Sequence, residues 1–293
     1  MALLSLAARR AARLGAVAAA TGAGLEAVSV LLPRLGDELD RGAPRLRWSL
    51  EGPSLGVEVD VDPSQRERDL GIALDVGVAP TPLAAVLERP TAATTFALDE
   101  EVGGVAVTVS ARGPQRARDE ALLWTAAGAG DAARAALRER LSFLAGGGDR
   151  IDTMAVTVRR SGAEVRAGVE VATAGPRVAA DLLARIATMA ADVGVTEPQR
   201  KLIEGVLEPL ARGRIIRLVV GASGGGTLAE LGLELSSQPW AVVSRVVAGF
   251  ARDGASQVDA LSAASDVVEV SELSLTLRGV EPPRVRVTLP LEP

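Results

Sequence analysis

The sequence predicts an α+β fold in which repeated strand-strand-helix units form antiparallel sheet(s) with helices packed mainly on one face. Pairs of short segments alternate apolar and polar residues, as the two strands of a hairpin do. A proline opens the helical pattern after several of these pairs, at Pro114, Pro176 and Pro239. The segments Gly168–Pro176 and Gly232–Pro239 also match each other, which indicates an internal repeat.

The first 42 residues are predicted to form a separate helical segment. Residues 14–25 are rich in Ala and Gly and follow Arg9, Arg10 and Arg13, so they are interpreted as a mature helix or as a secretory signal. The first 50 residues carry an excess of basic side chains, whereas the remainder is acidic. The three arginines are therefore a candidate interface with a partner or an anionic surface.

The other elements follow from helical spacing of three and four residues and from strand alternation. Helices are expected over 25–39 with a kink at Pro33, from Thr81, over 114–144, and from positions 176, 196 and 239. Strands are expected over 45–50, 57–62, 70–78, 96–98, 105–110, 154–158, 165–171, 215–220, 228–235, 267–277 and 284–289. The repeats divide into two α+β halves, 43–150 and 151–293. One continuous sheet and two separate domains both remain open.

The amino-acid alphabet of the chain excludes most classes of enzyme. The 293 residues contain no His, Cys, Tyr or Asn, and Lys201 is the single lysine among the 32 basic residues. A Ser–His or Cys–His catalytic couple, a Cys/His zinc site and a disulfide are therefore impossible. A net charge of −5 with 2% aromatic residues argues against nucleic-acid binding.

The segment Gly221–Thr227 resembles the glycine-rich turn of short-chain dehydrogenases, in which a strand runs through such a turn into a helix. The residues after it alternate, with Leu231, Leu233 and Leu235 apolar, so a strand is expected to follow. That family also needs a catalytic Tyr, and this chain has none. We therefore interpret the segment as a hairpin loop and expect no cofactor.

Three further features are candidates for a site. Glu58, Asp60 and Asp62 share one face of a strand and suit a divalent cation or a carboxylate pair, although a solvated strand face gives the same pattern. Lys201 is expected on the polar side of a helix. Trp124 is a candidate pocket wall or interface anchor, with the core as the simpler place for it.

These observations favour a non-catalytic structural or interaction protein, a subunit or scaffold of a larger assembly that associates with a membrane. A first alternative is a protein that binds a lipid or isoprenoid in an aliphatic cavity. A lower alternative is an enzyme that works with carboxylates and arginines alone. No catalytic, cofactor-binding or metal residue is assigned. Partners are expected to be a protein or a second copy, a membrane surface or a lipid, at the cell envelope, with the cytoplasm as the alternative.

Overall fold

The structure is a computed structural model of the 293-residue chain. It describes residues 5–50, 52, 54–78, 83–84, 87, 94–101, 104–113, 124, 130–172, 176–207, 215–223, 228–251 and 254–291. None of the helices in these ranges is both long enough and apolar enough to cross a lipid bilayer.

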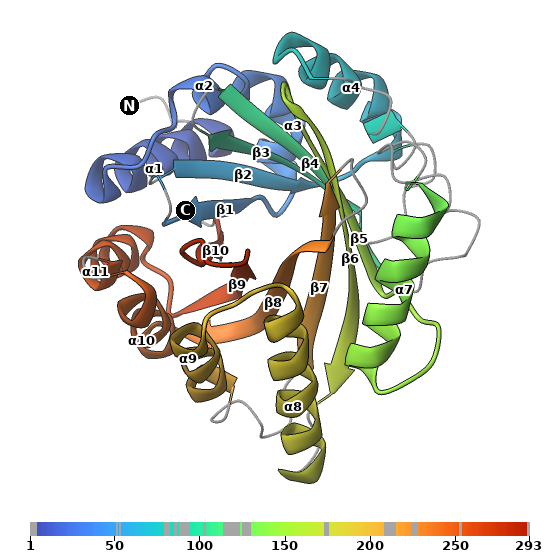
Figure 1. Ribbon diagram of the computed structural model, residues 1–293. Helices are drawn as coiled ribbons and strands as arrows, with labels where there is room; N and C mark the ends of the chain where they lie inside the picture. The colour runs from blue at the N-terminus through green and yellow to red at the C-terminus, as the bar shows by residue number, and fades with distance from the viewer. Residues whose placement is uncertain are drawn as a thin grey trace.

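Ten antiparallel strands in the described residues close into a barrel, which Figure 1 shows roughly along its axis. Strands that follow one another in the chain are neighbours, and β1 closes the ring by pairing with both β2 and β10. The strands are β1 (Arg45–Ser49), β2 (Ser54–Asp60), β3 (Thr94–Glu101), β4 (Gly104–Arg112), β5 (Thr153–Arg159), β6 (Gly162–Ala172), β7 (Ile215–Ser223), β8 (Leu228–Pro239), β9 (Glu269–Leu277) and β10 (Arg284–Pro290). Because the ring is closed, the barrel has no free edge strand.

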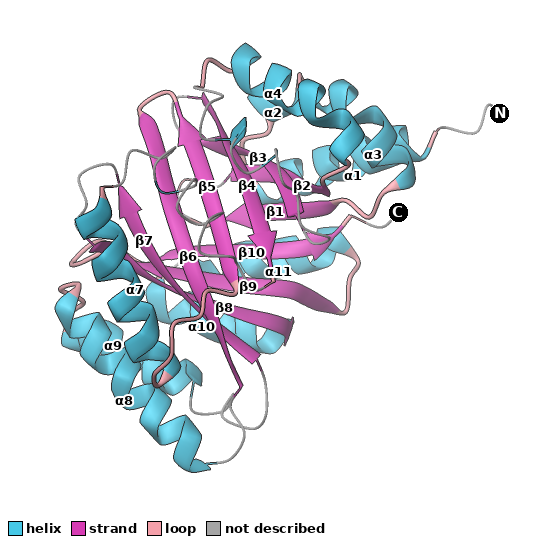
Figure 2. Ribbon diagram, turned by 90° about the vertical axis from the view of Figure 1, so that its right-hand side faces the viewer, coloured by secondary structure: helices cyan, strands magenta, loops and turns pink. Residues whose placement is uncertain are grey.

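The helices lie around the outside of the barrel, as the two views at right angles show (Figures 1 and 2). They are α1 (Leu6–Thr21), α2 (Glu26–Ser29), η1 (Leu32–Leu35), α3 (Gly36–Arg41), η2 (Pro63–Gln65), α4 (Arg66–Asp75), α7 (Asp131–Ala145), α8 (Pro176–Asp192), α9 (Glu197–Leu207), α10 (Trp240–Phe250) and α11 (Gly254–Ser265). Helix α7 packs on β6 and β7, and α10 packs on β8 and β9. Each contact buries one apolar stripe of a helix against the outer face of the barrel.

Alternation along each strand separates the two faces of the barrel wall. Leu46 and Trp48 of β1 and Phe96 of β3 are buried in the hydrophobic core, whereas Arg47 faces a cavity inside the barrel. The main hydrophobic core is thus the layer between barrel and helices, and the inside of the barrel is polar. The predicted α+β class, with antiparallel strands and helices on one face, is confirmed.

Two predicted elements have different structures. Residues 70–78, expected as a strand, belong largely to α4, which buries Ile72 and Ala73 and leaves Leu74 exposed. The helix expected over 25–39 is divided into α2, η1 and α3, because Pro33 in η1 cannot donate to the preceding turn. The helix expected from Thr81 and the first part of the helix expected over 114–144 lie mostly outside the described residues, although residues 83, 84, 87 and 124 are described and helical.

One sheet runs through both predicted halves. The boundary at residue 150 falls between β4 and β5, which pair along Val107–Arg112 and Thr153–Val158. The N-terminal helix α1 packs on α3 and on α11, near the end of the chain. Figure 1 shows α1 and α11 side by side at the left of the barrel.

Candidate active site

The lumen of the barrel contains two adjoining cavities. The first cavity, of about 290 Å³, lies toward the end of the barrel that carries the β-hairpin turns. The second cavity, of about 70 Å³, lies toward the opposite end, where helical segments connect successive hairpins. Arg166, Ser274 and Arg286 line both. The described residues of the two walls are mostly charged or hydroxyl-bearing, so a bound molecule would meet polar groups on most sides.

Four arginines line the first cavity, and we call them the arginine cluster: Arg159 on β5, Arg166 on β6, and Arg284 and Arg286 on β10. They occupy the inward positions of their strands, because alternate residues such as Val165 and Val287 are buried in the hydrophobic core on the other side of the wall. Strand alternation therefore fixes the side to which each guanidinium group points.

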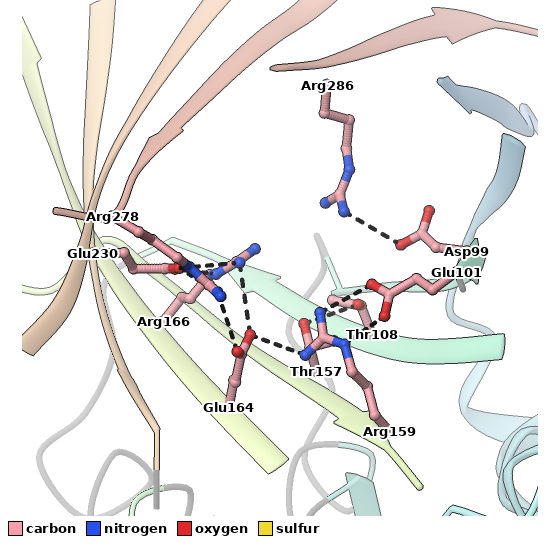
Figure 3. Close-up of polar contacts among 10 residues, drawn as sticks. All are labelled: Asp99, Glu101, Thr108, Thr157, Arg159, Glu164, Arg166, Glu230, Arg278 and Arg286. Carbon is pink, nitrogen blue, oxygen red and sulfur yellow. Dashed lines mark hydrogen bonds and ion pairs between the residues drawn. The ribbon is translucent and has the colours of Figure 1, made fainter. Parts of the chain in front are cut away.

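Carboxylates compensate part of this positive charge (Figure 3). Arg159 donates two hydrogen bonds to Glu101, of 2.5 and 3.0 Å, and its Nη1 lies 3.0 Å from Oε2 of Glu164. Burial alone would raise the pKa of Glu164, but the attraction of Arg159, Arg166 and Arg278 outweighs it, and the pKa lies below its ordinary value. Glu164 is therefore a permanent anion of the lumen.

Glu230 on β8 is the most enclosed carboxylate of this network, with 5% of its side chain exposed. It accepts a hydrogen bond of 2.5 Å from Nε of Arg166, and Nη2 of Arg278 lies 2.6 Å from its Oε2. Burial raises the pKa of Glu230, but the two guanidinium groups lower it by a larger amount, so the pKa lies below the ordinary glutamate value.

Between the paired strands β4 and β5, the hydroxyl groups of Thr108 and Thr157 share a hydrogen bond of 3.0 Å.

Arg286 is only weakly compensated by a carboxylate. Oδ2 of Asp99 lies 3.8 Å from its Nη2, and among the described residues its buried Nε has no hydrogen-bond partner. Burial first, and then the positive charge of Arg47, lower the pKa of Arg286 to about 10 despite the opposing charge of Asp99. It is still a cation at neutral pH, and its position favours an added anion.

A different arrangement lines the second cavity. Nη1 of Arg217 donates to two carboxylates, Glu234 on β8 at 3.1 Å and Glu272 on β9 at 3.0 Å. Glu272 also accepts from Nη2 of Arg112 at 2.9 Å. Burial and the negative charge of Glu272 raise the pKa of Glu234 above the ordinary glutamate range. Glu234 therefore holds a proton more readily than an ordinary glutamate does.

The three carboxylates that the sequence placed on one strand face do not form one site. Glu58 and Asp60 lie on β2, and Arg45 donates to both at 2.7 Å. Asp62 lies beyond the strand, where it accepts from the backbone N–H of Ser64 at the start of η2. Glu58 lines the second cavity, so part of the face interpreted as solvated belongs to the lumen.

The four candidate interface residues lie away from the lumen. Arg9 is exposed and Arg13 is partly exposed on α1, whereas Arg10 is buried and donates to the backbone oxygens of Leu39 at 2.6 Å and Gly42 at 3.1 Å. Trp124 is buried in the hydrophobic core. Their role in an interface stays a prediction.

Two other sequence features are accounted for by the fold. Lys201 is exposed on α9, with Nζ 4.0 Å from Oε1 of Glu197. The segment from Gly221 enters the end of β7, and β8 follows from Leu228, so a strand succeeds the glycines as expected. Residues 224–227 of this segment lie outside the described residues.

Sequence reasoning missed the arginine cluster, although a signal for it is present. In Glu164–Glu170, one arginine and two acids share the polar positions of a single strand, and in Arg284–Arg286 the alternate positions are both arginine. A polar strand face that simply meets water does not need such matched charges, whereas an enclosed face does. Arg and Glu at alternate positions of several strands therefore indicate a polar interior.

No known protein family matches the chain by sequence, and no curated protein matches it. Solved structures match over nearly its whole length. The 5-dimethylallyl tryptophan synthase from Streptomyces coelicolor in complex with DMASPP and Trp has a TM-score of 0.70 at 14% identity, over 98% of this chain and 95% of that chain. The 6-dimethylallyltryptophan synthase from Micromonospora olivasterospora has a TM-score of 0.69 at 18% identity, over 99% and 98%. PriB in binary complex with product diphosphate has a TM-score of 0.66 at 15% identity, over 99% and 97%.

The chain has the fold of these prenyltransferases. This finding contradicts the non-catalytic scaffold expected from the sequence, because the whole chain, including its N-terminal helical segment, is accounted for by an enzyme fold. The interpretation as a protein-interaction subunit rested on the absent His, Cys and Tyr, which do not restrict chemistry carried out by guanidinium and carboxylate groups. The aliphatic lining expected for the first alternative is not found around the two described cavities, where most side chains are charged or carry a hydroxyl group; binding of a lipid or isoprenoid stays a prediction.

Proposed function

We propose that the protein is an enzyme that transfers a prenyl group from a prenyl diphosphate to a polar acceptor inside the barrel. The observation that carries this proposal is the arginine cluster around the first cavity, with Arg286 incompletely compensated. The shared fold supports it, because PriB has been solved with product diphosphate and two dimethylallyl tryptophan synthases with DMASPP and Trp. Of the functions considered from the sequence, the carboxylate-and-arginine enzyme, ranked lowest, is the nearest to this proposal.

The arginine cluster suits the leaving group of such a reaction. When the bond between the allylic carbon and the diphosphate oxygen breaks, its electron pair stays on the diphosphate, whose negative charge grows. Guanidinium groups bind phosphate oxygens through paired N–H donors, so a cluster of them stabilises the departing diphosphate. Arg284 and Arg286 are two residues apart on β10 and face the same cavity.

The positive charge that develops on the prenyl carbon would meet carboxylates. Asp99 and Glu101 line the first cavity beside the arginine cluster. None of the described residues that line the two cavities has an aromatic side chain. Trp48 and Phe96 lie instead in the hydrophobic core between the barrel and the helices. Electrostatic attraction to carboxylates would therefore take the place of aromatic faces, the other common means of stabilising a cation.

A turnover screen tests the proposal. The full-length protein is incubated with dimethylallyl diphosphate and, in turn, with L-tryptophan, L-serine and L-arginine as acceptors, and both pyrophosphate release and the prenylated product are measured. We expect acceptor-dependent pyrophosphate release, reduced about 10-fold to 100-fold in Arg286→Gln through loss of a charged hydrogen bond. Arg245→Gln, an exposed position on α10, is the matched control and should keep the wild-type rate. Equal rates in the two variants, or no release with any acceptor, would contradict the proposal.

A further inference from the structure

Two of the carboxylates that line the second cavity differ in the number of arginines that donate hydrogen bonds to them. Glu234 and Glu272 come from the neighbouring strands β8 and β9, and both line the second cavity. Glu272 is held by two guanidinium groups, those of Arg112 and Arg217. Glu234 accepts a hydrogen bond from the same Nη1 of Arg217 that also donates to Glu272. Glu234 is therefore the less compensated of the two carboxylates.

Glu234 also differs from the carboxylates around the first cavity. Glu101 receives two hydrogen bonds from Arg159, and Glu230 is paired with Arg166 and Arg278. Arginines thus hold both carboxylates in place, and at Glu230 they lower the pKa below its ordinary value. A quarter of the Glu234 side chain is exposed, and it lines the second cavity. Its carboxylate is thus both accessible to a ligand and weakly compensated.

The position of Glu234 relative to the arginine cluster is suited to a two-substrate reaction. Arg166, Ser274 and Arg286 separate the first cavity from the second and line both. A diphosphate held by the arginine cluster would direct its prenyl group along the lumen, and an acceptor would approach from the side of the second cavity. A space of about 70 Å³ takes about two water-sized groups at roughly 30 Å³ each, so it accommodates the reacting hydroxyl or N–H group of an acceptor.

We infer that Glu234 is the general base that takes the proton of the acceptor, and that the acceptor places a hydroxyl or N–H group in the second cavity. This inference rests on the proposed function. As the bond from the acceptor oxygen or nitrogen to the prenyl carbon forms, the carbon–oxygen bond to diphosphate breaks and diphosphate keeps its electron pair. The O–H or N–H bond of the acceptor breaks, its electron pair stays on the acceptor atom, and the proton forms a neutral acid on Glu234.

Several charged groups face Glu234 and set its proton affinity. Arg217 on β7 attracts a negative charge there, Arg112 on β4 and Arg166 on β6 do so from farther away, and Glu272 on β9 repels it. Burial adds to the repulsion. Removing the charge of Glu272 should therefore lower the pKa of Glu234, whereas removing Glu234 itself should remove the base.

The test is the pH dependence of pyrophosphate release from dimethylallyl diphosphate, with the acceptor that gives the highest rate in the screen above. We expect Glu234→Gln to lower kcat about 100-fold or more, to leave KM for dimethylallyl diphosphate within about threefold, and to remove the acidic limb of the profile. Glu272→Gln should keep an acidic limb but move it to lower pH. A purely structural role for Glu234 would not move the limb in this way.

Glu170→Gln is the matched control. Glu170 also contacts Arg217, with Oε1 3.2 Å from Nε, but it does not line the second cavity. Its profile should follow the wild type. The inference is overturned if the wild type is active and Glu234→Gln keeps both its kcat and its acidic limb. A wild type that releases no pyrophosphate overturns the proposed function together with the inference.

A second readout is independent of turnover. In protein labelled with carbon-13 at the glutamate carboxyl carbon, the resonance lost in Glu234→Gln should titrate above the ordinary glutamate range. It should titrate lower in Glu272→Gln. A resonance that titrates in the ordinary range in the wild type would contradict the inference, whatever the activity.

Discussion

Gly56 of β2 lies opposite Asp99 of β3 in the barrel wall, and the missing side chain at position 56 leaves room for the Asp99 carboxylate. A β-carbon on Gly56 would overlap Oδ1 of Asp99 and would lie 2.5 Å from the carbonyl oxygen of Leu98. The carboxylate held in this space has Oδ2 3.2 Å from Nη1 of Arg47 and 3.8 Å from Nη2 of Arg286. One glycine thus determines the position of a counterion of the arginine cluster.

The substitution Gly56→Ala should lower the free energy of unfolding by about 1–3 kcal/mol, because the added methyl group overpacks the wall and part of the clash is with backbone. Urea unfolding measures this change. Gly15→Ala is the control, since Gly15 lies in α1 with open space around its position, and there alanine should be neutral or stabilising by up to about 1 kcal/mol. Equal stability of the two variants would show that the space beside Asp99 is not restricted.

Asp69 on α4 should make the protein more stable as the pH falls toward 5. Its side chain is fully buried, Nη2 of Arg68 lies 2.5 Å from its Oδ1, and Arg68 also pairs with Glu38 of α3. Burial raises the pKa of Asp69 to about 6, against the attraction of Arg68. Because the folded state binds the proton more tightly than the unfolded chain, stability is gained as the pH falls through about 6.

The measurement is urea unfolding of the wild type and Asp69→Asn between pH 4 and 8. The stability of the wild type relative to the variant should rise toward low pH, by up to about 3 kcal/mol for a change in pKa of this size. A difference that stays constant or falls toward acid would show that burial of Asp69 does not disfavour its charge.

Glu230 should behave in the opposite way. Its pKa is lowered in the folded state, so its contribution is present above the ordinary glutamate pKa and is lost as the pH falls below it. Glu230→Gln should destabilise the protein by about 3–5 kcal/mol at neutral pH, since Arg166 and Arg278 would lose a buried partner. Glu269→Gln, at an exposed position on β9, should change stability by less than about 0.5 kcal/mol. Similar values for the two variants would contradict a buried network in the lumen.

Arg10 tests whether the N-terminal helix is part of the folded body. Arg10→Met removes the hydrogen bonds to the backbone oxygens of Leu39 and Gly42 and should lower the free energy of unfolding by about 1–3 kcal/mol. Arg9→Met, one position earlier and exposed, should leave it unchanged. If Arg9→Met lowers the free energy of unfolding as much as Arg10→Met does, the contact between α1 and α3 does not hold α1 in place.

Strand alternation allowed the fold class and most strands to be predicted. In Arg45–Ser49 it separated the aliphatic face from the polar face correctly. It could not show that the polar face is enclosed, because closure depends on pairing between β1 and β10, at opposite ends of the chain. The same limit hid the arginine cluster, whose members come from β5, β6 and β10 and meet only in the closed barrel.

The strand expected over residues 70–78 failed for a local reason. Leu70, Ile72 and Leu74 alternate, but in α4 it is Ile72 and Ala73 that are buried and Leu74 is largely exposed. Over a few residues, alternation and helical spacing cannot be told apart when the segment is rich in small aliphatic residues. The contact of Arg68 with Glu38 of α3, together with its ion pair to the buried Asp69, favours the helix.

Calorimetric titration with inorganic pyrophosphate tests most directly whether the lumen binds a diphosphate. We expect the wild type to bind it, Arg286→Gln to bind it about 10-fold to 100-fold more weakly because a charged hydrogen bond is lost, and Arg245→Gln to bind it as the wild type does. Failure of the wild type to bind pyrophosphate, or equal affinities of the wild type and Arg286→Gln, would contradict a diphosphate site at the arginine cluster.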